Sequence, residues 1–202
     1  MNKLKLFVDF DTTMIDSTTC LINCYRDLTG EEPLTYKDWT WNISTAYPNC
    51  NKEIIHKCFD IPLFFKYAKD NIFPNCKETL QELTKYYDIT VVSCGTEDNL
   101  RLKEQFLKEE FTFVSFVGLQ QSKKTFDKSC VCKDGVLIDD RLDCLLSSKQ
   151  CLNILFRYNN NPYEWQEGYK DLIENGKISY VATKWNDELK DILLSWYQYN
   201  NR

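Results

Sequence analysis

Short apolar runs rich in Val, Ile, Leu and Phe recur along this chain, as in strands that are buried on both faces of a sheet. Between the later runs, apolar residues follow a spacing of three and four, which predicts amphipathic helices. One such helix spans about Glu97 to Glu110, and a last one carries Leu189, Leu193 and Trp196 on one face. This alternation predicts an α/β fold with a parallel sheet. The predicted strands are 4–8, 89–93, 113–118, 136–138 and 151–157.

The alternation is interrupted once, directly after the first strand. Residues 16–73 contain no convincing strand but show helical patterns, the first starting at Ser17 and the last at Pro62. Between them lies an aromatic loop around Trp41. We therefore expect a small helical cap, residues 16–73, inserted into an α/β core made of residues 1–15 and 74–202.

Composition narrows the classes of function. With 202 residues and 43% hydrophobic content, the chain can fill one core and a small appendage. A net charge of −5 without a long basic run argues against a nucleic-acid polymer as partner. No apolar stretch approaches the ~20 residues of a membrane span, and no cleavable leader pattern precedes the first strand. We therefore expect a cytoplasmic protein without membrane contact, whose ten cysteines stay reduced.

Polar side chains stand at the ends of several predicted strands. The first strand ends in Asp9 and Asp11, another ends at Ser93, and a third ends in Asp139 and Asp140. A parallel sheet brings these ends to one edge, where open α/β folds bind their ligands. Two carboxylates about 4 Å apart repel each other by roughly 4 kcal/mol at an effective dielectric of about 20. Such a group is tolerable when a cation lies between its members.

This set of side chains meets the needs of phosphoryl transfer. Mg²⁺ prefers oxygen ligands and binds substrate phosphates. An aspartate can attack phosphorus, and a lysine and a hydroxyl can hold the oxygens that carry charge in the transition state. Lys123 and Lys124 lie between Ser93 and Asp139 in the sequence and offer the ammonium group. The sequence therefore predicts magnesium-dependent chemistry on a phosphate ester.

The motifs resemble those of the haloacid dehalogenase (HAD) superfamily of phosphatases, which implies a Rossmann-like, three-layer parallel sheet. The resemblance covers nearly the whole chain. Within the superfamily it looks most like the 5′(3′)-deoxyribonucleotidases, because of the compact cap, the form of the last motif and the segment Trp185–Leu189. The four motifs, in the family's order, are Asp9-Phe10-Asp11-Thr12-Thr13, Val91-Val92-Ser93, Lys124 (or Lys123) and Leu137-Ile138-Asp139-Asp140-Arg141.

The resemblance implies a role for each matched residue. Asp9 would be the nucleophile that forms an aspartyl phosphate, and its second oxygen would bind Mg²⁺. Asp11 would protonate the leaving oxygen and later deprotonate the attacking water, while its backbone carbonyl binds the metal. Ser93 would hydrogen-bond the phosphoryl group, and Cys94 and Gly95 would offer backbone amides nearby.

The later motifs supply the remaining charges. Lys124, with Lys123 as the competing candidate, would neutralise the nucleophile and the phosphate. Asp139 would bind Mg²⁺ through its side chain, and Asp140 would orient the groups around it. One departure is Thr12, because the family usually has glycine at this position, where a tight turn brings the backbone close to the phosphate.

Further residues are predicted to bind the substrate, a small nucleotide. Ser17 and Arg141 are predicted to contact the substrate, although Arg141 could instead form a surface ion pair with Asp140. Trp41 and Phe65 of the cap are predicted to form a wall against which the nucleobase packs. The competing interpretation of Trp41 is that it holds the cap together.

Two other functions stay open from the sequence. One is the same chemistry on another small phosphorylated metabolite, such as a sugar phosphate or an amino-acid phosphate. The other is a non-catalytic binding module that uses the same fold. The sequence leaves undecided the base preference, the 5′ or 3′ position of the phosphate, the choice between deoxyribose and ribose, and whether the chain forms a homodimer.

Overall fold

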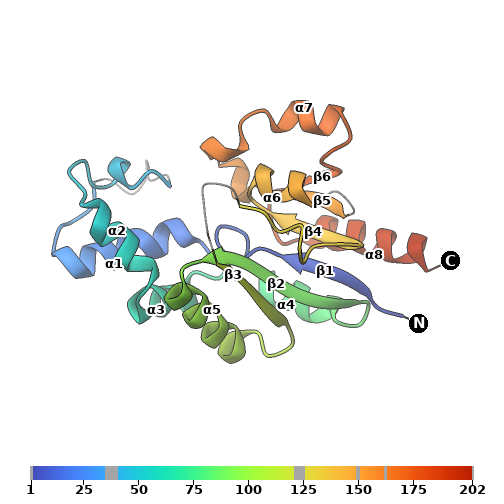
Figure 1. The fold of residues 1–202 in the computed structure, drawn as a ribbon, viewed down its shortest axis with the longest axis horizontal. Helices are drawn as coiled ribbons and strands as arrows, with labels where there is room; N and C mark the ends of the chain where they lie inside the picture. Colours follow the sequence, from blue (N-terminus) through green and yellow to red (C-terminus); the bar gives the residue numbers. More distant parts are fainter. Residues whose placement is uncertain (1, 35–40, 121–125, 149–150, 162, 202) are drawn as a thin grey trace.

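The computed structural model of the chain describes residues 2–34, 41–120, 126–148, 151–161 and 163–201. Within these residues, six parallel strands form one sheet in the order β3-β2-β1-β4-β5-β6 (Figure 1). The predicted α/β fold is confirmed. The strands are β1 Leu4–Val8, β2 Tyr87–Gly95, β3 Ser115–Gln120, β4 Gly135–Asp139, β5 Leu152–Phe156 and β6 Tyr180–Ala182.

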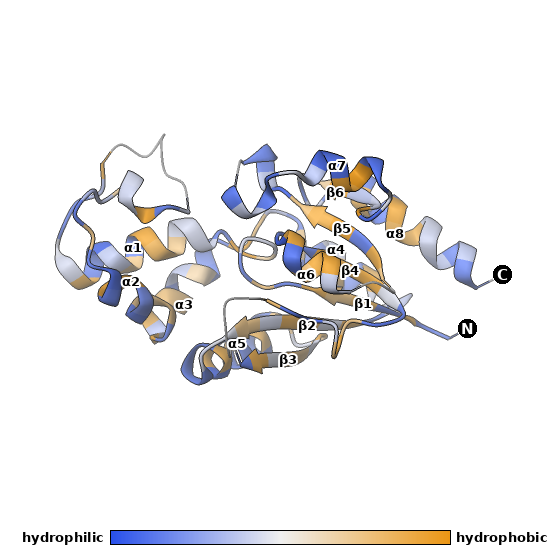
Figure 2. Ribbon diagram, turned by 45° about the horizontal axis from the view of Figure 1, so that its top comes forward, coloured by the Kyte–Doolittle hydropathy of each residue, from blue (hydrophilic) through white to orange (hydrophobic). Residues whose placement is uncertain are grey.

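Helices cover both faces of the sheet. The helices of the core are α4 Cys76–Leu83, α5 Glu97–Glu110, α6 Leu142–Ser147, α7 Tyr169–Glu174 and α8 Asp187–Asn200, with short 3₁₀ helices η3 Tyr158–Asn160 and η4 Glu164–Gln166. Figure 2 shows β4 and β5 as largely hydrophobic, as expected for strands between two layers. Among the described residues, no helix is long and apolar enough to cross a membrane.

The two faces of β1 show how the layers form. Successive side chains of a strand point to opposite faces. Leu6 therefore joins a large core cluster that also contains Phe106 of α5 and Leu189 of α8. Phe7, the next residue, joins a smaller cluster with Leu145 of α6. The sheet is thus the middle of three layers, as predicted.

The order of the strands places a crevice beside β1. From β1 the chain runs to β2 and β3 on one side, and then crosses to β4 on the other side. The backbone N–H of Asp9 donates to the carbonyl oxygen of Ile138 at 2.9 Å, so the ends of β1 and β4 are neighbours. A reversal of this kind leaves a crevice at the carboxyl ends of the two strands, where α/β proteins bind ligands.

Three helices lie together beyond the carboxyl ends of the strands (Figure 1). They are α1 Ser17–Thr29, α2 Lys52–Phe59 and α3 Pro62–Asp70, with the 3₁₀ helix η2 Ile43–Thr45 before α2. Helix α1 packs against both α2 and α3. We propose that residues 16–73 are the cap and that residues 1–15 and 74–202 are the core, a division that this grouping supports.

Two helix starts differ in detail from the prediction. A serine at the start of a helical pattern predicts that Ser17 caps α1. Instead, Ser17 is the first residue of α1, and Asp16 caps the helix by accepting from the backbone N–H of Thr19 at 3.1 Å. Asn75 and Glu78 have the spacing of a capping box, which predicts that Asn75 caps α4. This prediction is wrong, because Asn75 precedes α4 with φ 63° and makes no side-chain capping bond. By contrast, Gly30 ends α1 in the left-handed conformation at φ 73°, as expected of glycine there.

Candidate active site

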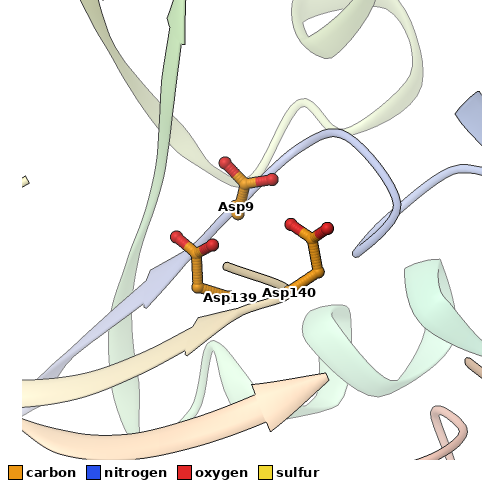
Figure 3. A group of neighbouring side chains, drawn as sticks. All are labelled: Asp9, Asp139 and Asp140. Atoms are coloured by element: carbon orange, nitrogen blue, oxygen red, sulfur yellow. The ribbon is translucent and has the colours of Figure 1, made fainter. Parts of the chain in front are cut away.

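Three buried carboxylates meet at the ends of β1 and β4. Oxygens of Asp9, Asp139 and Asp140 lie within 4.8 Å of one another, and Figure 3 shows these side chains gathered from two neighbouring strands. None of the three residues is more than 7% exposed. Anions this close and this well buried need positive charge beside them. Their hard oxygen donors are the ligands that Mg²⁺ prefers, so the residues present fit this ion.

Lys128 supplies one positive charge to this acid cluster. Its Nζ donates to Asp9 Oδ1 and, at 2.7 Å, to Asp139 Oδ2. The side chain of Lys128 is only 1% exposed. Lys124 and Lys123, the lysines favoured by the sequence, lie outside the described residues. The sequence feature that could have identified Lys128 is its position eleven residues before Asp139, close to the strand that carries the acids.

One ammonium group does not balance three carboxylates. Burial, together with the charges of Asp139 and Asp11, raises the pKa of Asp9 to about 7, although Lys128 lowers it. Burial and the charges of Asp9 and Asp139 hold the pKa of Asp140 well above its usual range. Burial lowers the pKa of Lys128, but the two carboxylates that it contacts raise it well above normal. Negative charge in the acid cluster therefore remains uncompensated, and a further cation would stabilise it.

Asp139 and Asp140 have different partners. One oxygen of Asp139 accepts from the ammonium of Lys128, and the other accepts from the backbone N–H of Arg141 at 2.9 Å. The Asp140 carboxylate accepts from a neutral donor, Trp165 Nε1, at 2.8 Å. A cation therefore compensates the charge of Asp139, whereas no ammonium of the described residues forms a hydrogen bond with Asp140. This difference favours Asp140 over Asp139 as the side chain that faces a metal ion.

A second lysine holds the other aspartate of the first motif. Lys103 of α5 is 1% exposed, and its Nζ donates to Asp11 Oδ2 and, at 2.8 Å, to Ser93 Oγ. Ser17 Oγ donates to the other oxygen of Asp11 at 2.9 Å, so Ser17 orients this carboxylate. Lys103 is not among the residues predicted from the sequence. The signal is its place on the apolar face of α5 with Phe106, because a lysine at such a position requires an anionic partner.

Thr12 stands where the resemblance implies a glycine. It has φ 52°, in the left-handed region that disfavours β-branched side chains. Two hydrogen bonds stabilise the turn: the backbone N–H of Thr12 donates to Ser17 Oγ at 3.3 Å, and its hydroxyl donates to the carbonyl oxygen of Asp11 at 2.8 Å. The tight turn at this position therefore forms without glycine.

A cavity of about 360 Å³ joins the acid cluster to a group of aromatic rings. The aromatic wall, as we call it, consists of Trp41, Phe59, Phe126 and Trp165. Trp41 lies between Phe59, at 5.8 Å between ring centroids, and Trp165, at 5.5 Å. Of the residues predicted from the sequence, those that line the cavity are Asp9, Asp11, Trp41, Ser93, Cys94, Gly95, Asp140 and Arg141.

Phe65 does not belong to this wall, so the sequence-based prediction needs correction. It is 7% exposed and packs against Phe10, Phe64 and Phe106 in the core. The physical reason is the orientation of α3, which buries Phe64, Phe65 and Ala68 together. Phe59, at the end of α2, takes the place expected of Phe65.

Arg141 also differs from one of its predicted interpretations. It pairs with Asp143, at 3.0 and 2.9 Å, rather than with Asp140. Its guanidinium lies 3.8 Å from the centroid of the Phe126 ring, a cation–π arrangement. These contacts fix an arginine at the side of the cavity.

Two solved structures of HAD hydrolases share this fold along almost their whole length. One is a haloacid dehalogenase-like protein, SP0104 from Streptococcus pneumoniae, with 16% identity and a TM-score of 0.55, covering 96% of this chain and 98% of its own. The other is a magnesium-bound HAD hydrolase from Bacillus subtilis, with 12% identity, a TM-score of 0.57 and coverage of 96% and 99%. At these levels of identity, the two structures show that the chain has the fold of the HAD hydrolases.

The sequence gives a narrower placement. The chain is 30% identical over 197 residues to a 5′(3′)-deoxyribonucleotidase from Clostridium acetobutylicum, covering 96% of this chain and 100% of that protein. No protein-family model matches the chain. The chain belongs to the 5′(3′)-deoxyribonucleotidase family within the HAD superfamily.

Proposed function

We propose that this protein is a magnesium-dependent phosphatase that removes the phosphate from deoxyribonucleoside monophosphates. The observation that carries the proposal is the cavity, which has the acid cluster at one end and the aromatic wall at the other. Its volume of about 360 Å³ is typical of a pocket for a small ligand. A nucleotide has the matching shape, with a charged phosphate at one end and a flat base at the other.

The chemistry begins at Asp9. One of its carboxylate oxygens attacks phosphorus while the bond from phosphorus to the nucleoside oxygen breaks, and Asp11 gives its proton to that leaving oxygen. The product is an aspartyl phosphate on Asp9. Asp11 then takes a proton from a water molecule, whose oxygen attacks phosphorus and breaks the bond to Asp9. Inorganic phosphate leaves, and both aspartates return to their starting states.

Two neighbouring groups support these steps. Lys128 contacts Asp9 and can stabilise the charge on the phosphoryl oxygens, the role predicted for Lys124. Ser93 Oγ accepts from Lys103 and keeps its own proton to donate to the phosphoryl group. Lys103 also holds Asp11 in place, which sets the direction of proton transfer.

Asp9, Asp140 and the backbone carbonyl of Asp11 would hold Mg²⁺. The ion would neutralise charge on the transferring phosphoryl group. This assignment gives the metal-binding role to Asp140, whereas the resemblance implies Asp139. The contact between Asp139 and Lys128 supports the exchange, because an ammonium already compensates Asp139.

A panel of deoxyribonucleotides and ribonucleotides, each with the phosphate at the 5′ or 3′ position, tests the proposal by release of inorganic phosphate. Sugar phosphates, phosphoserine and p-nitrophenyl phosphate complete the panel. We expect turnover of deoxynucleotides that requires Mg²⁺ and disappears in Asp9→Asn. Preference for a sugar or amino-acid phosphate would overturn the substrate, and near wild-type turnover by Asp9→Asn would overturn the mechanism. The cytoplasmic location stays a prediction, and whether the chain forms a homodimer stays undecided.

A further inference from the structure

Trp165 lies between the acid cluster and the aromatic wall. It belongs to η4, and its Nε1 donates to Asp140 Oδ2 at 2.8 Å. The next residue, Gln166, donates from Nε2 to the backbone carbonyl oxygen of Asp140 at 2.7 Å. One short helix therefore holds both the carboxylate and the backbone of Asp140.

The segment that carries Trp165 is itself firmly held. Gln166 is 2% exposed, and its Oε1 accepts from Arg157 Nε at 2.9 Å. The Trp165 ring stacks on Tyr163, with centroids 4.8 Å apart and an interplanar angle of 5°. Packing thus determines the direction in which the indole N–H points, and that direction is toward Asp140.

The same indole contacts the cap. Trp41 meets it edge to face, with centroids 5.5 Å apart and an interplanar angle of 85°. Both rings line the cavity. Trp165 therefore contacts the aromatic wall with its ring and the acid cluster with its N–H.

An indole N–H is suited to orienting a carboxylate for a cation. It donates one hydrogen bond and carries no charge, so it fixes the side chain without replacing the cation. Removing outer partners of this kind typically weakens metal binding by roughly 10- to 100-fold. Lys128 acts differently on Asp139, because its ammonium compensates the charge directly.

We infer that Trp165 is a positioning residue that orients Asp140 for the cation and connects the metal site to the cap through Trp41. The inference rests on the proposed magnesium-dependent function. Trp165 lies outside the four HAD motifs, so the inference assigns a residue beyond these motifs to the metal site. It also predicts that a ring without an N–H at this position keeps the contact with the cap but weakens the metal site.

The test is calorimetric titration of Mg²⁺ into the metal-free protein. Trp165→Phe keeps an aromatic ring and removes the N–H, and Trp196→Phe of α8 is the matched control outside the cavity. We expect the Kd for Mg²⁺ to rise roughly 10- to 100-fold in Trp165→Phe and to stay unchanged in the control. The concentration of Mg²⁺ that gives half-maximal hydrolysis of p-nitrophenyl phosphate should rise in parallel, with kcat recovered at saturating Mg²⁺.

A second variant covers the case in which Trp165→Phe folds poorly. Trp165→His keeps a ring N–H, and we expect its affinity for Mg²⁺ to lie between those of the wild type and Trp165→Phe. The inference is overturned if either Trp165 variant binds Mg²⁺ as tightly as Trp196→Phe, or if the wild type binds none. If the wild type binds Mg²⁺ but hydrolyses no phosphate monoester, the proposed function fails while the titration still decides the role of Trp165.

Discussion

Replacing Lys128 by methionine removes the ammonium from the acid cluster while keeping a side chain of similar length. In the wild type this group contacts Asp9 and Asp139, and all three residues are buried. The variant therefore leaves two carboxylates without their cation in a site that water hardly reaches. We expect both the stability and the activity of the protein to fall, for separable reasons.

The structure sets the size of the effect. Breaking a buried ion pair from one side typically costs 3–5 kcal/mol. Because the pKa of Asp9 is already about 7, this carboxyl can take up a proton, and we expect the lower limit of about 3 kcal/mol. For a chain of this size, that corresponds to a fall in Tm of roughly 6–12 °C. If the same energy is lost from the charged transition state, kcat falls roughly 100-fold or more.

Thermal unfolding and hydrolysis of p-nitrophenyl phosphate measure the two effects. The double variant Lys128→Met with Asp139→Asn removes an uncompensated charge, so we expect it to regain most of the lost Tm but none of the lost kcat. Lys124→Met is the comparison for the lysine that the sequence favoured. The assignment of Lys128 is refuted if Lys128→Met keeps near wild-type kcat while Lys124→Met loses it.

Three further results are expected. Trp41→Ala should lower kcat/KM for deoxynucleotides by roughly 10- to 100-fold, because stacking on a base is worth about 1–3 kcal/mol. Hydrolysis of p-nitrophenyl phosphate should stay unchanged. An equal fall in both activities together with a lower Tm would instead mean that Trp41 holds the cap together. Asp140→Asn should raise the Kd for Mg²⁺, measured by calorimetry, more than Asp139→Asn does, and the reverse order would restore the assignment made from the sequence. The Tm of the metal-free protein should fall as the pH rises from about 4 to about 7. The reason is that folded Asp9 keeps its proton up to a pKa of about 7, whereas the unfolded chain releases it near 3.8. Mg²⁺ should reduce this fall in Tm, and the Asp9→Asn variant should show a smaller fall.

The polar residues at the strand ends could be predicted because their positions depend only on the order of neighbouring residues in the sequence. An apolar run defines a strand, and the residue after the run lies at the carboxyl edge of a parallel sheet. Asp9, Ser93 and Asp139 were placed in this way, and the structure brings them together at that edge. By contrast, β6 has only three residues, too few for a periodic pattern.

The partners of those side chains could not be predicted in the same way. Lys103 lies on a helix and Lys128 in a loop, and both reach the acids only because the sheet and α5 bring distant segments together. The choice between Phe59 and Phe65 depends on how the cap helices turn against the core. Both residues stand at apolar positions of their helices, so spacing alone does not distinguish them.

The carboxylates and the aromatic wall differ in how the fold positions them, and this difference decides which properties of a related phosphatase can be transferred to this chain. The carboxylates proposed to act on phosphate lie at the ends of neighbouring strands, and a sheet of fixed strand order preserves such positions even when most of the sequence changes. The aromatic wall is assembled from separate segments: Trp41 and Phe59 come from the cap, Phe126 precedes β4, and Trp165 lies in η4. Each of these segments can vary without disturbing the sheet. Identity of 30% to a deoxyribonucleotidase therefore supports the reaction more strongly than the choice of base, and the base preference has to be measured on this wall.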